Sequence, residues 1–181
     1  MRIVDLSDRF SWQQYKMDAH AGTHVDSPAF LFEDGRNIQD FGLERFITDA
    51  ALLDLTLKKP GESIDDEDLE AAEEAAGLAL REGESVILFT GSSSSDVYLS
   101  RNGAEYLEFK GVGLVGIDTA NIDGHESAER AAHRVFLGKE ILVLEGLCNL
   151  GSVDSSRFRL ACFPLKLSGT ISPVRAVAML D

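Results

Sequence analysis

Apolar residues along the chain gather in short runs, which predict buried β-strands separated by polar turns. The runs lie at residues 50–55, 85–90, 112–118, 140–144, 160–163 and 174–180, with one more short strand expected at 3–6. Runs of this length are typical of strands that are covered on both faces of a sheet.

Between these runs, other segments have helical periodicity. Residues 65–81 predict an amphipathic helix that stops near Gly83, because apolar residues recur along one stripe at Leu69, Ala72, Ala76 and Leu80. Shorter helices are expected over 101–109 and 128–137. Strands and helices are mixed along the whole length without an internal repeat, so we predict one α/β or α+β domain spanning residues 1–181.

Composition and charge limit the classes of binding partner that the protein is expected to have. The 181 residues are 44% hydrophobic and 27% charged, as in an ordinary globular chain with a substantial core. The net charge of −14 argues against binding to nucleic acid or to an anionic membrane surface. No apolar run approaches the length of a membrane span, and the amino terminus lacks a secretory signal pattern, so we expect a cytoplasmic protein.

Two other features predict no chemistry. Cys148 and Cys162 are expected to be free, buried thiols, as is usual in a reducing compartment. The serine-rich loop at 91–96 lacks the Gly-x-Ser-x-Gly pattern of a nucleophile elbow and the Gly-Lys-Ser/Thr ending of a phosphate loop. We interpret it as a flexible polar loop.

The most informative segment is His-Ala-Gly-Thr-His-Val-Asp-Ser-Pro at residues 20–28. Imidazole and carboxylate groups bind borderline divalent metals, and three protein ligands leave positions open for water. A helix would point Asp26 away from His24, whereas an extended segment turns His20, His24 and Asp26 to one side, with Gly22 leaving room for an ion. We therefore predict an extended metal-binding segment; the alternative is an ordinary polar loop.

Three residues later in the chain are further candidates for the metal site, and the sequence supports them to different degrees. Glu145 directly follows an apolar strand, where functional sites collect and where a buried carboxylate needs a partner. Asp118 follows another such strand, but there capping of a loop and support of a site are equally plausible. His133, taken alone, is more typical of a half-buried helix histidine than of a metal ligand.

Together these residues resemble the cyclase family of metal-dependent hydrolases, which includes bacterial kynurenine formamidase and isatin hydrolase. The resemblance covers nearly the whole chain from Asp5, and it rests on the 20–28 motif, Gly116-Ile117-Asp118-Thr119, His133, Glu145-Gly-Leu-Cys-Asn-Leu150, and Gly169 with Pro173-Val174-Arg175. It implies a swivelling β/β/α fold with mixed sheets and flanking helices. It also implies hydrolysis of an amide, formamide or cyclic amide, with one or two divalent ions, zinc being favoured over manganese.

The resemblance further implies a role for each residue. His20, His24 and Asp26 correspond to ligands of a first ion, Asp26 and Glu145 to carboxylates that bridge to a second ion, and His133 to a ligand of that second ion. A bound metal lowers the pKa of water from 15.7 toward about 7, which makes metal-bound hydroxide available as the nucleophile. Asp26 or Glu145 is then expected to accept the remaining proton. Relatives also imply a homo-oligomer, a dimer or a tetramer, acting on a small-molecule substrate.

The chain departs from the family pattern at Phe30, where relatives usually carry a histidine that donates and accepts a proton. One interpretation is that hydrolysis continues with another proton donor, either His125 or water. The alternative is a non-catalytic protein on the same fold that binds a metal or a small ligand, and a third reading is a structural protein without metal. The segment between Ser7 and His20 is also shorter than in relatives, so their substrates are not transferred.

Overall fold

The structure, a computed structural model, describes residues 16–92, 96–124 and 128–180. Its main sheet contains β1 (His24–Asp26), β2 (Ile47–Asp54), β4 (Ser85–Phe89), β6 (Leu114–Ile117), β7 (Leu142–Glu145), β8 (Arg157–Ala161), β9 (Ile171–Pro173) and β10 (Val177–Met179). A second, small sheet pairs β3 (Ser63–Ile64) with β5 (Tyr98–Leu99). The strand expected at 3–6 lies outside the described residues.

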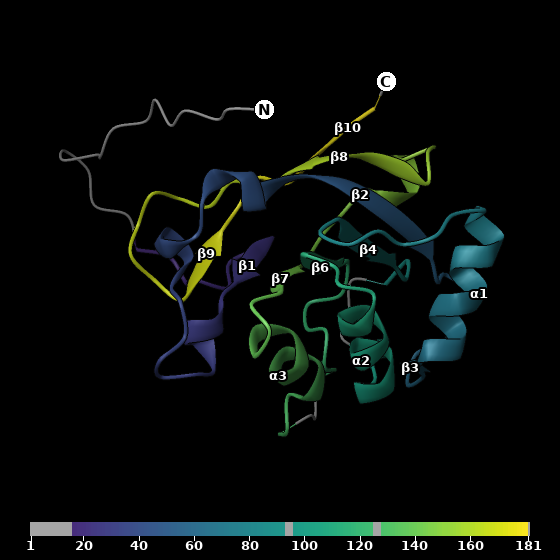
Figure 1. Ribbon diagram of the computed structural model, residues 1–181, viewed down its shortest axis with the longest axis horizontal. Helices are drawn as coiled ribbons and strands as arrows, with labels where there is room; N and C mark the ends of the chain where they lie inside the picture. Colours follow the sequence, from purple (N-terminus) through teal and green to yellow (C-terminus); the bar gives the residue numbers. More distant parts are fainter. Residues whose placement is uncertain (1–15, 93–95, 125–127, 181) are drawn as a thin grey trace.

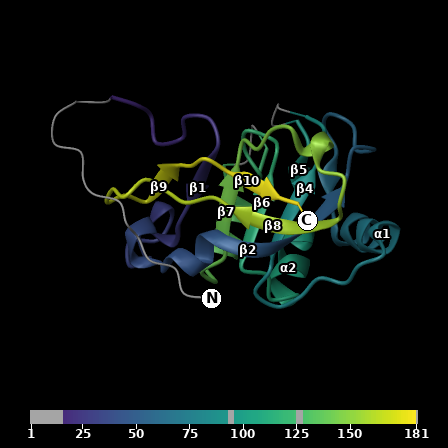
Figure 2. The same ribbon diagram turned by 90° about the horizontal axis from the view of Figure 1, so that it is seen from above.

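The main sheet is mixed, with the strand order β10-β8-β2-β4-β6-β7-β1-β9. Its centre, β2-β4-β6-β7, is parallel, whereas β8 and β10 on one side and β1 and β9 on the other run antiparallel to their neighbours. Seen from above, β1 and β9 lie at the opposite end of the molecule from α1 (Asp66–Ala76) (Figure 2).

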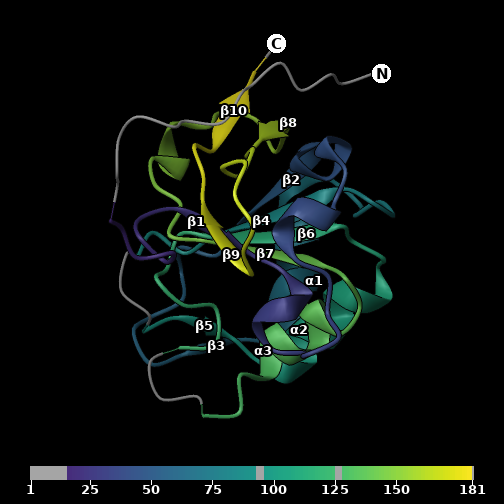
Figure 3. The same cartoon turned by 90° about the vertical axis from the view of Figure 1, so that its left-hand side faces the viewer.

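The helices α1, α2 (Arg101–Phe109) and α3 (Ala131–Leu137) all lie on the same side of the main sheet (Figure 1). They remain grouped on that side when the molecule is viewed from the end that carries β1 and β9 (Figure 3). This placement follows from the parallel centre, because parallel neighbours need long crossover connections that cover a face of the sheet. The mixed sheet with flanking helices confirms the predicted α/β class.

Two buried apolar clusters hold the layers together. One cluster fills the space between the sheet and the helices and includes Leu88, Val143 and Phe136, and the other covers the opposite face and includes Phe46 and Leu144. Val143 and Leu144 are consecutive residues of β7 that point to opposite faces, as the alternation of a strand requires. The same alternation places the next residue, at the end of β7, on the helix side of the sheet.

The first long helix is shorter than predicted. Its last residue is Ala76, because Gly77 adopts a left-handed conformation with φ of +63° and ends the helix there rather than near Gly83. Leu80 is part of the predicted stripe but lies beyond the helix, where its N–H donates to the Glu73 carboxylate over 3.0 Å. In the described part of the chain, no helix combines the length and the apolar character needed to cross a membrane.

Candidate metal centre

Strand β1 carries the core of the predicted site and is placed between β7 and β9. His24 lies opposite Glu145 in the antiparallel register with β7, and Asp26 lies two residues further along β1. Because side chains alternate along a strand, His24 and Asp26 face the same side of the sheet as Glu145. The sequence spacing His-x-Asp is therefore the spacing of one strand face.

The residues before β1 form a turn rather than the predicted extended segment. Gly22 has a positive φ of 65°, which reverses the chain, and the Ala21 N–H donates to the Asp18 carbonyl over 3.1 Å. His20 nevertheless remains close, with its ring centroid 5.2 Å from that of His24, although its side chain is 48% exposed. The extended prediction is wrong for residues 20–23 and confirmed from His24 onward.

Asp26 and Glu145 each direct one oxygen toward His24 and the other toward His133. His24 Nε2 lies 3.2 Å from Glu145 Oε2 and 3.8 Å from Asp26 Oδ1. His133 Nε2 lies 3.2 Å from Asp26 Oδ2 and 3.4 Å from Glu145 Oε1. The two carboxylates thus lie between two imidazoles, which is the arrangement expected of carboxylates that bridge two ion positions.

These distances suit the binding of a divalent cation. Ligand atoms about 2.0–2.2 Å from one zinc ion lie roughly 3.3–3.6 Å from each other in tetrahedral geometry. The groups His20–His24–Asp26 and Asp26–His133–Glu145 each offer one ligand atom per residue within 4.8 Å of the others. Sequence reasoning selected all five of these residues, and the fold brings the distant His133 and Glu145 to the segment at 20–28.

Two buried polar atoms at the centre lack a hydrogen-bond partner among the described residues, namely His24 Nε2 and Asp26 Oδ1. Their residues are only 3% and 1% exposed. A buried polar atom without a partner typically costs about 1–3 kcal/mol, and native proteins rarely leave one unsatisfied. The atoms face one another across 3.8 Å, so a cation bound between them would satisfy both.

Asp123 is a residue of the cluster that sequence reasoning missed. Its Oδ2 accepts a hydrogen bond from His133 Nδ1 over 2.5 Å, and its Oδ1 accepts one from the Ala132 N–H over 2.6 Å. This bond holds a proton on Nδ1 of His133, so that Nε2 is the ring nitrogen left to bind a metal ion in place of its own proton. At His24 the Nδ1–H donates to a backbone carbonyl, that of Gly22, over 2.9 Å, with the same effect.

The carboxylates raise the pKa of both buried histidines. Burial alone would lower the pKa of His133, but hydrogen bonds to Asp123 and Asp26 and the charge of Glu145 raise it to about 10. Burial likewise opposes the shift at His24, where the nearby Glu145 carboxylate, the Gly22 carbonyl and the charge of Asp26 raise the pKa above its usual 6.5. The negative potential that holds these protons also favours a metal ion in their place.

Two other residues singled out in the sequence, Asp118 and Phe30, lie outside the set of candidate metal ligands. Asp118 caps the loop after β4, since its carboxylate accepts hydrogen bonds from the N–H groups of Thr90 and Gly91 and from the Thr90 hydroxyl. Phe30 lies against the cluster, with its ring centroid 5.8 Å from that of His133. His125 lies outside the described residues, so its predicted role as a proton donor stays a prediction.

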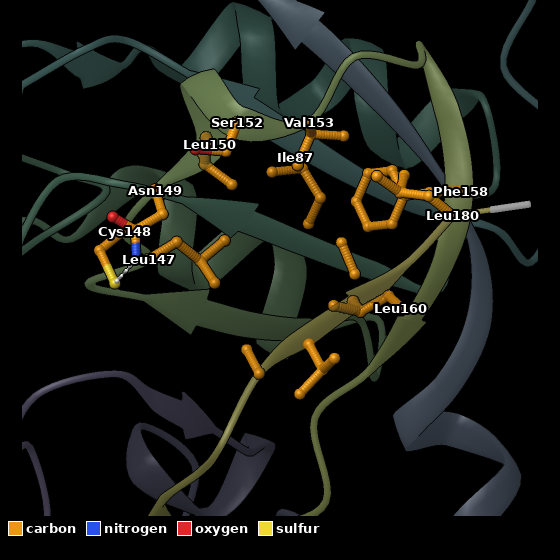
Figure 4. Close-up of a pocket in the computed structure, with 13 residues that line it drawn as sticks. Ile87, Leu147, Cys148, Asn149, Leu150, Ser152, Val153, Phe158, Leu160 and Leu180 are labelled. Atoms are coloured by element: carbon orange, nitrogen blue, oxygen red, sulfur yellow. Dashed lines mark hydrogen bonds between the residues drawn. The ribbon is translucent and has the colours of Figure 1, made fainter.

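A separate apolar cavity of about 280 Å³ opens on the sheet face away from the helices (Figure 4). Its wall includes Ile87, Phe158 and Leu160, and Cys148 lies at its edge. Both cysteines are free, but Cys148 is exposed, so its predicted burial is wrong, whereas Cys162 is buried as expected. The lining includes none of the predicted metal ligands, which separates this cavity from the cluster.

Comparison with known proteins gives consistent results. The Cyclase family model matches residues 4–124. A kynurenine formamidase from Salinibacter ruber is 31% identical over 171 residues, which cover 90% of this chain and 76% of that protein. A solved structure of a potential metal-dependent hydrolase with cyclase activity is 29% identical, with a TM-score of 0.76 over 90% of this chain and 80% of that one. Isatin hydrolase A from Labrenzia aggregata shares the fold, with a TM-score of 0.83 and 22% identity over 94% of this chain and 77% of that one.

Proposed function

The chain belongs to the cyclase family, and on this premise we propose that it is a metal-dependent hydrolase that cleaves a carbon–nitrogen bond in a small amide, formamide or cyclic amide. The observation that carries the proposal is the buried cluster in which Asp26 and Glu145 each offer one oxygen to His24 and one to His133. The non-catalytic alternative is not favoured, because the matched relatives are named as hydrolytic enzymes.

Two groups of residues would hold the metal. His20, His24 and Asp26 form the first ion position, and His133 with the second oxygens of Asp26 and Glu145 forms the other. A set of neutral imidazoles and carboxylates suits zinc first and manganese next. Because His24 Nε2 and Asp26 Oδ1 are the atoms left without partners, the first position has the stronger claim to an ion.

Different residues of the chain would have different roles in hydrolysis. A bound divalent cation supplies an acidified water and polarises the carbonyl of the scissile bond. Asp26 or Glu145 would take up a proton from that water, and on Glu145 the Oε1 atom already accepts the Ile122 N–H over 2.8 Å. The near-complete burial of both carboxylates strengthens their electrostatic influence on the reacting atoms.

Metal removal and a ligand variant test this proposal. Hydrolysis of a panel of formamides, lactams and lactones should be measured for the wild type, for the wild type after thorough chelation, and for His24→Ala. We expect chelation and His24→Ala to abolish turnover, and metal addition to restore it only in the wild type. Turnover that survives metal removal would contradict the proposal.

The source of the proton for the leaving amine needs its own variant. Loss of a general acid typically lowers the rate 10²- to 10⁴-fold. His125→Ala should therefore slow hydrolysis by that factor if His125 is the donor, and should leave it unchanged if water is the donor. Metal content measured on the same variant separates this effect from a loss of binding.

A further inference from the structure

Thr23 fastens the turn before β1 to the end of β7. Its hydroxyl donates to the Gly146 carbonyl over 2.7 Å, and its own carbonyl accepts the Val174 N–H over 2.9 Å. Gly146 is held in turn, because its N–H donates to the carbonyl of Thr119 over 2.9 Å and Thr119 is fully buried. The turn at Gly22 and Thr23 is therefore anchored to the protein interior, although Gly22 itself is exposed.

Gly146 also packs against the backbone of this turn. A Cβ atom at Gly146 would lie 3.0 Å from the carbonyl oxygen of Gly22 and 3.4 Å from its carbonyl carbon, which is closer than most side chains come to backbone atoms. Gly146 also has a φ of +67°, in the left-handed region that favours glycine. Both the space and the backbone conformation thus require glycine at this position, which directly follows Glu145 in the chain.

The Gly22 carbonyl against which Gly146 packs is also the acceptor for the His24 ring. His24 Nδ1 lies 2.9 Å from this oxygen, which leaves Nε2 facing Glu145 Oε2 at 3.2 Å. Strand pairing fixes only the backbone of His24 opposite Glu145, whereas the rotation of the ring depends on the acceptor at Nδ1. The position of the Gly22 carbonyl therefore decides where His24 Nε2 points.

We propose that Thr23 and Gly146 are positioning residues of the metal centre, which hold the Gly22 carbonyl so that His24 keeps the ring orientation of a metal ligand. This inference rests on the proposed function, since it needs a metal at the cluster. Both residues act through the Gly22 carbonyl rather than by contact with an ion. Loss of the group that orients a ligand histidine typically costs about 10- to 100-fold in metal affinity.

Two substitutions of Thr23 separate this role from a general loss of stability. Thr23→Val keeps the shape of the side chain but removes the hydroxyl, whereas Thr23→Ser keeps the hydroxyl. Chelator competition on the folded chain should give a zinc Kd about 10- to 100-fold weaker for Thr23→Val and within about threefold of the wild type for Thr23→Ser. A Thr23→Val protein that binds zinc as tightly as the wild type would overturn the proposal.

Glycine variants test the steric contact with a matched control. Gly77 has a similar left-handed φ of +63°, but a Cβ atom there would meet nothing within 4 Å, and it follows α1 at the opposite end of the molecule from β1 (Figure 2). Gly146→Ala and Gly77→Ala therefore impose similar backbone strain, and only Gly146→Ala pushes on the Gly22 carbonyl. We expect only Gly146→Ala to weaken the zinc Kd, by about 10- to 100-fold. Equal changes in both variants would contradict the proposal.

The His24 ring provides a measurement that does not depend on bound metal. NMR of the histidine rings, with and without zinc, should show a slowly exchanging Nδ1–H signal for His24 in the wild type and Thr23→Ser, identified by its loss in His24→Ala. This proton should exchange faster in Thr23→Val and Gly146→Ala, and unchanged exchange in both would overturn the proposal. If the exchange changes as expected while the wild type binds no divalent ion, the proposed function fails and the positioning of His24 stands.

Discussion

Asp123→Asn is the substitution that most sharply probes how the second histidine is positioned. Asp123 is 5% exposed and makes two hydrogen bonds, one from the Ala132 N–H and one from His133 Nδ1. Asparagine has nearly the same shape but only one accepting oxygen. If that oxygen keeps the bond to Ala132, the amide NH₂ group faces His133 Nδ1 as a donor.

The consequence is a change of tautomer at His133. Nδ1 would accept from the asparagine and the ring proton would move to Nε2, which faces Asp26 Oδ2 at 3.2 Å and Glu145 Oε1 at 3.4 Å. The lone pair that binds a metal would then be lost. Removal of such an orienting carboxylate typically costs 10- to 100-fold in metal affinity, which corresponds to about 1.4–2.7 kcal/mol.

Competition with a calibrated chelator gives the zinc and manganese Kd values for the wild type and Asp123→Asn. The matched control is Asp118→Asn, because Asp118 is also a buried aspartate, 7% exposed, whose hydrogen bonds go to the Thr90–Gly91 loop instead of the cluster. We expect the control to lower thermal stability without changing the metal Kd. A Kd within twofold of the wild type for Asp123→Asn, or an equal shift in both variants, would refute the reasoning.

The two thiols should react differently, because Cys148 is exposed whereas burial raises the pKa of Cys162 to about 12. A thiol reagent should label one cysteine per native chain and two cysteines per denatured chain. Two labelled cysteines on the native protein would contradict this prediction. In metal-free protein the free energy of unfolding should fall as the pH rises from about 6.5 to about 10, because His133 holds its proton more tightly when folded. Urea titrations across that range check the sign, and a flat profile would contradict it. Metal affinity should increase over the same range, since the metal displaces that proton, which chelator competition at each pH measures. Phe136→Ala should cost about 3–5 kcal/mol, because the ring is fully buried between sheet and helices; a loss below about 1 kcal/mol in urea unfolding would show that this cluster is loosely packed.

The strands and the shared strand face of His24 and Asp26 were predictable because they depend on local patterns. Apolar runs mark the central parallel strands, and the alternation of a strand explains why His24 and Asp26 share a face. Features that depend on one residue's backbone conformation or on a distant partner were not predictable from the sequence. Gly77 ends the first helix early through its left-handed backbone, and Gly22 turns the chain just before β1.

Asp123 shows the limit most clearly. In the sequence it is one acidic residue among many, in a loop between a strand and a helix, and its spacing from His133 matches no metal-ligand pattern. Its role appears only when the fold brings its two oxygens to the Ala132 N–H and to the His133 ring. Exposure of Cys148 likewise depends on the path of the loop after β7 rather than on residue type.

The most direct test of the account is native mass spectrometry of the purified protein, with metal identity determined by elemental analysis. We predict one or two divalent ions per chain and a lower metal content for His24→Ala, with chelation lowering the thermal stability of the wild type. Wild-type protein that retains no divalent ion when zinc or manganese is supplied, and that melts at the same temperature with and without chelator, would contradict it.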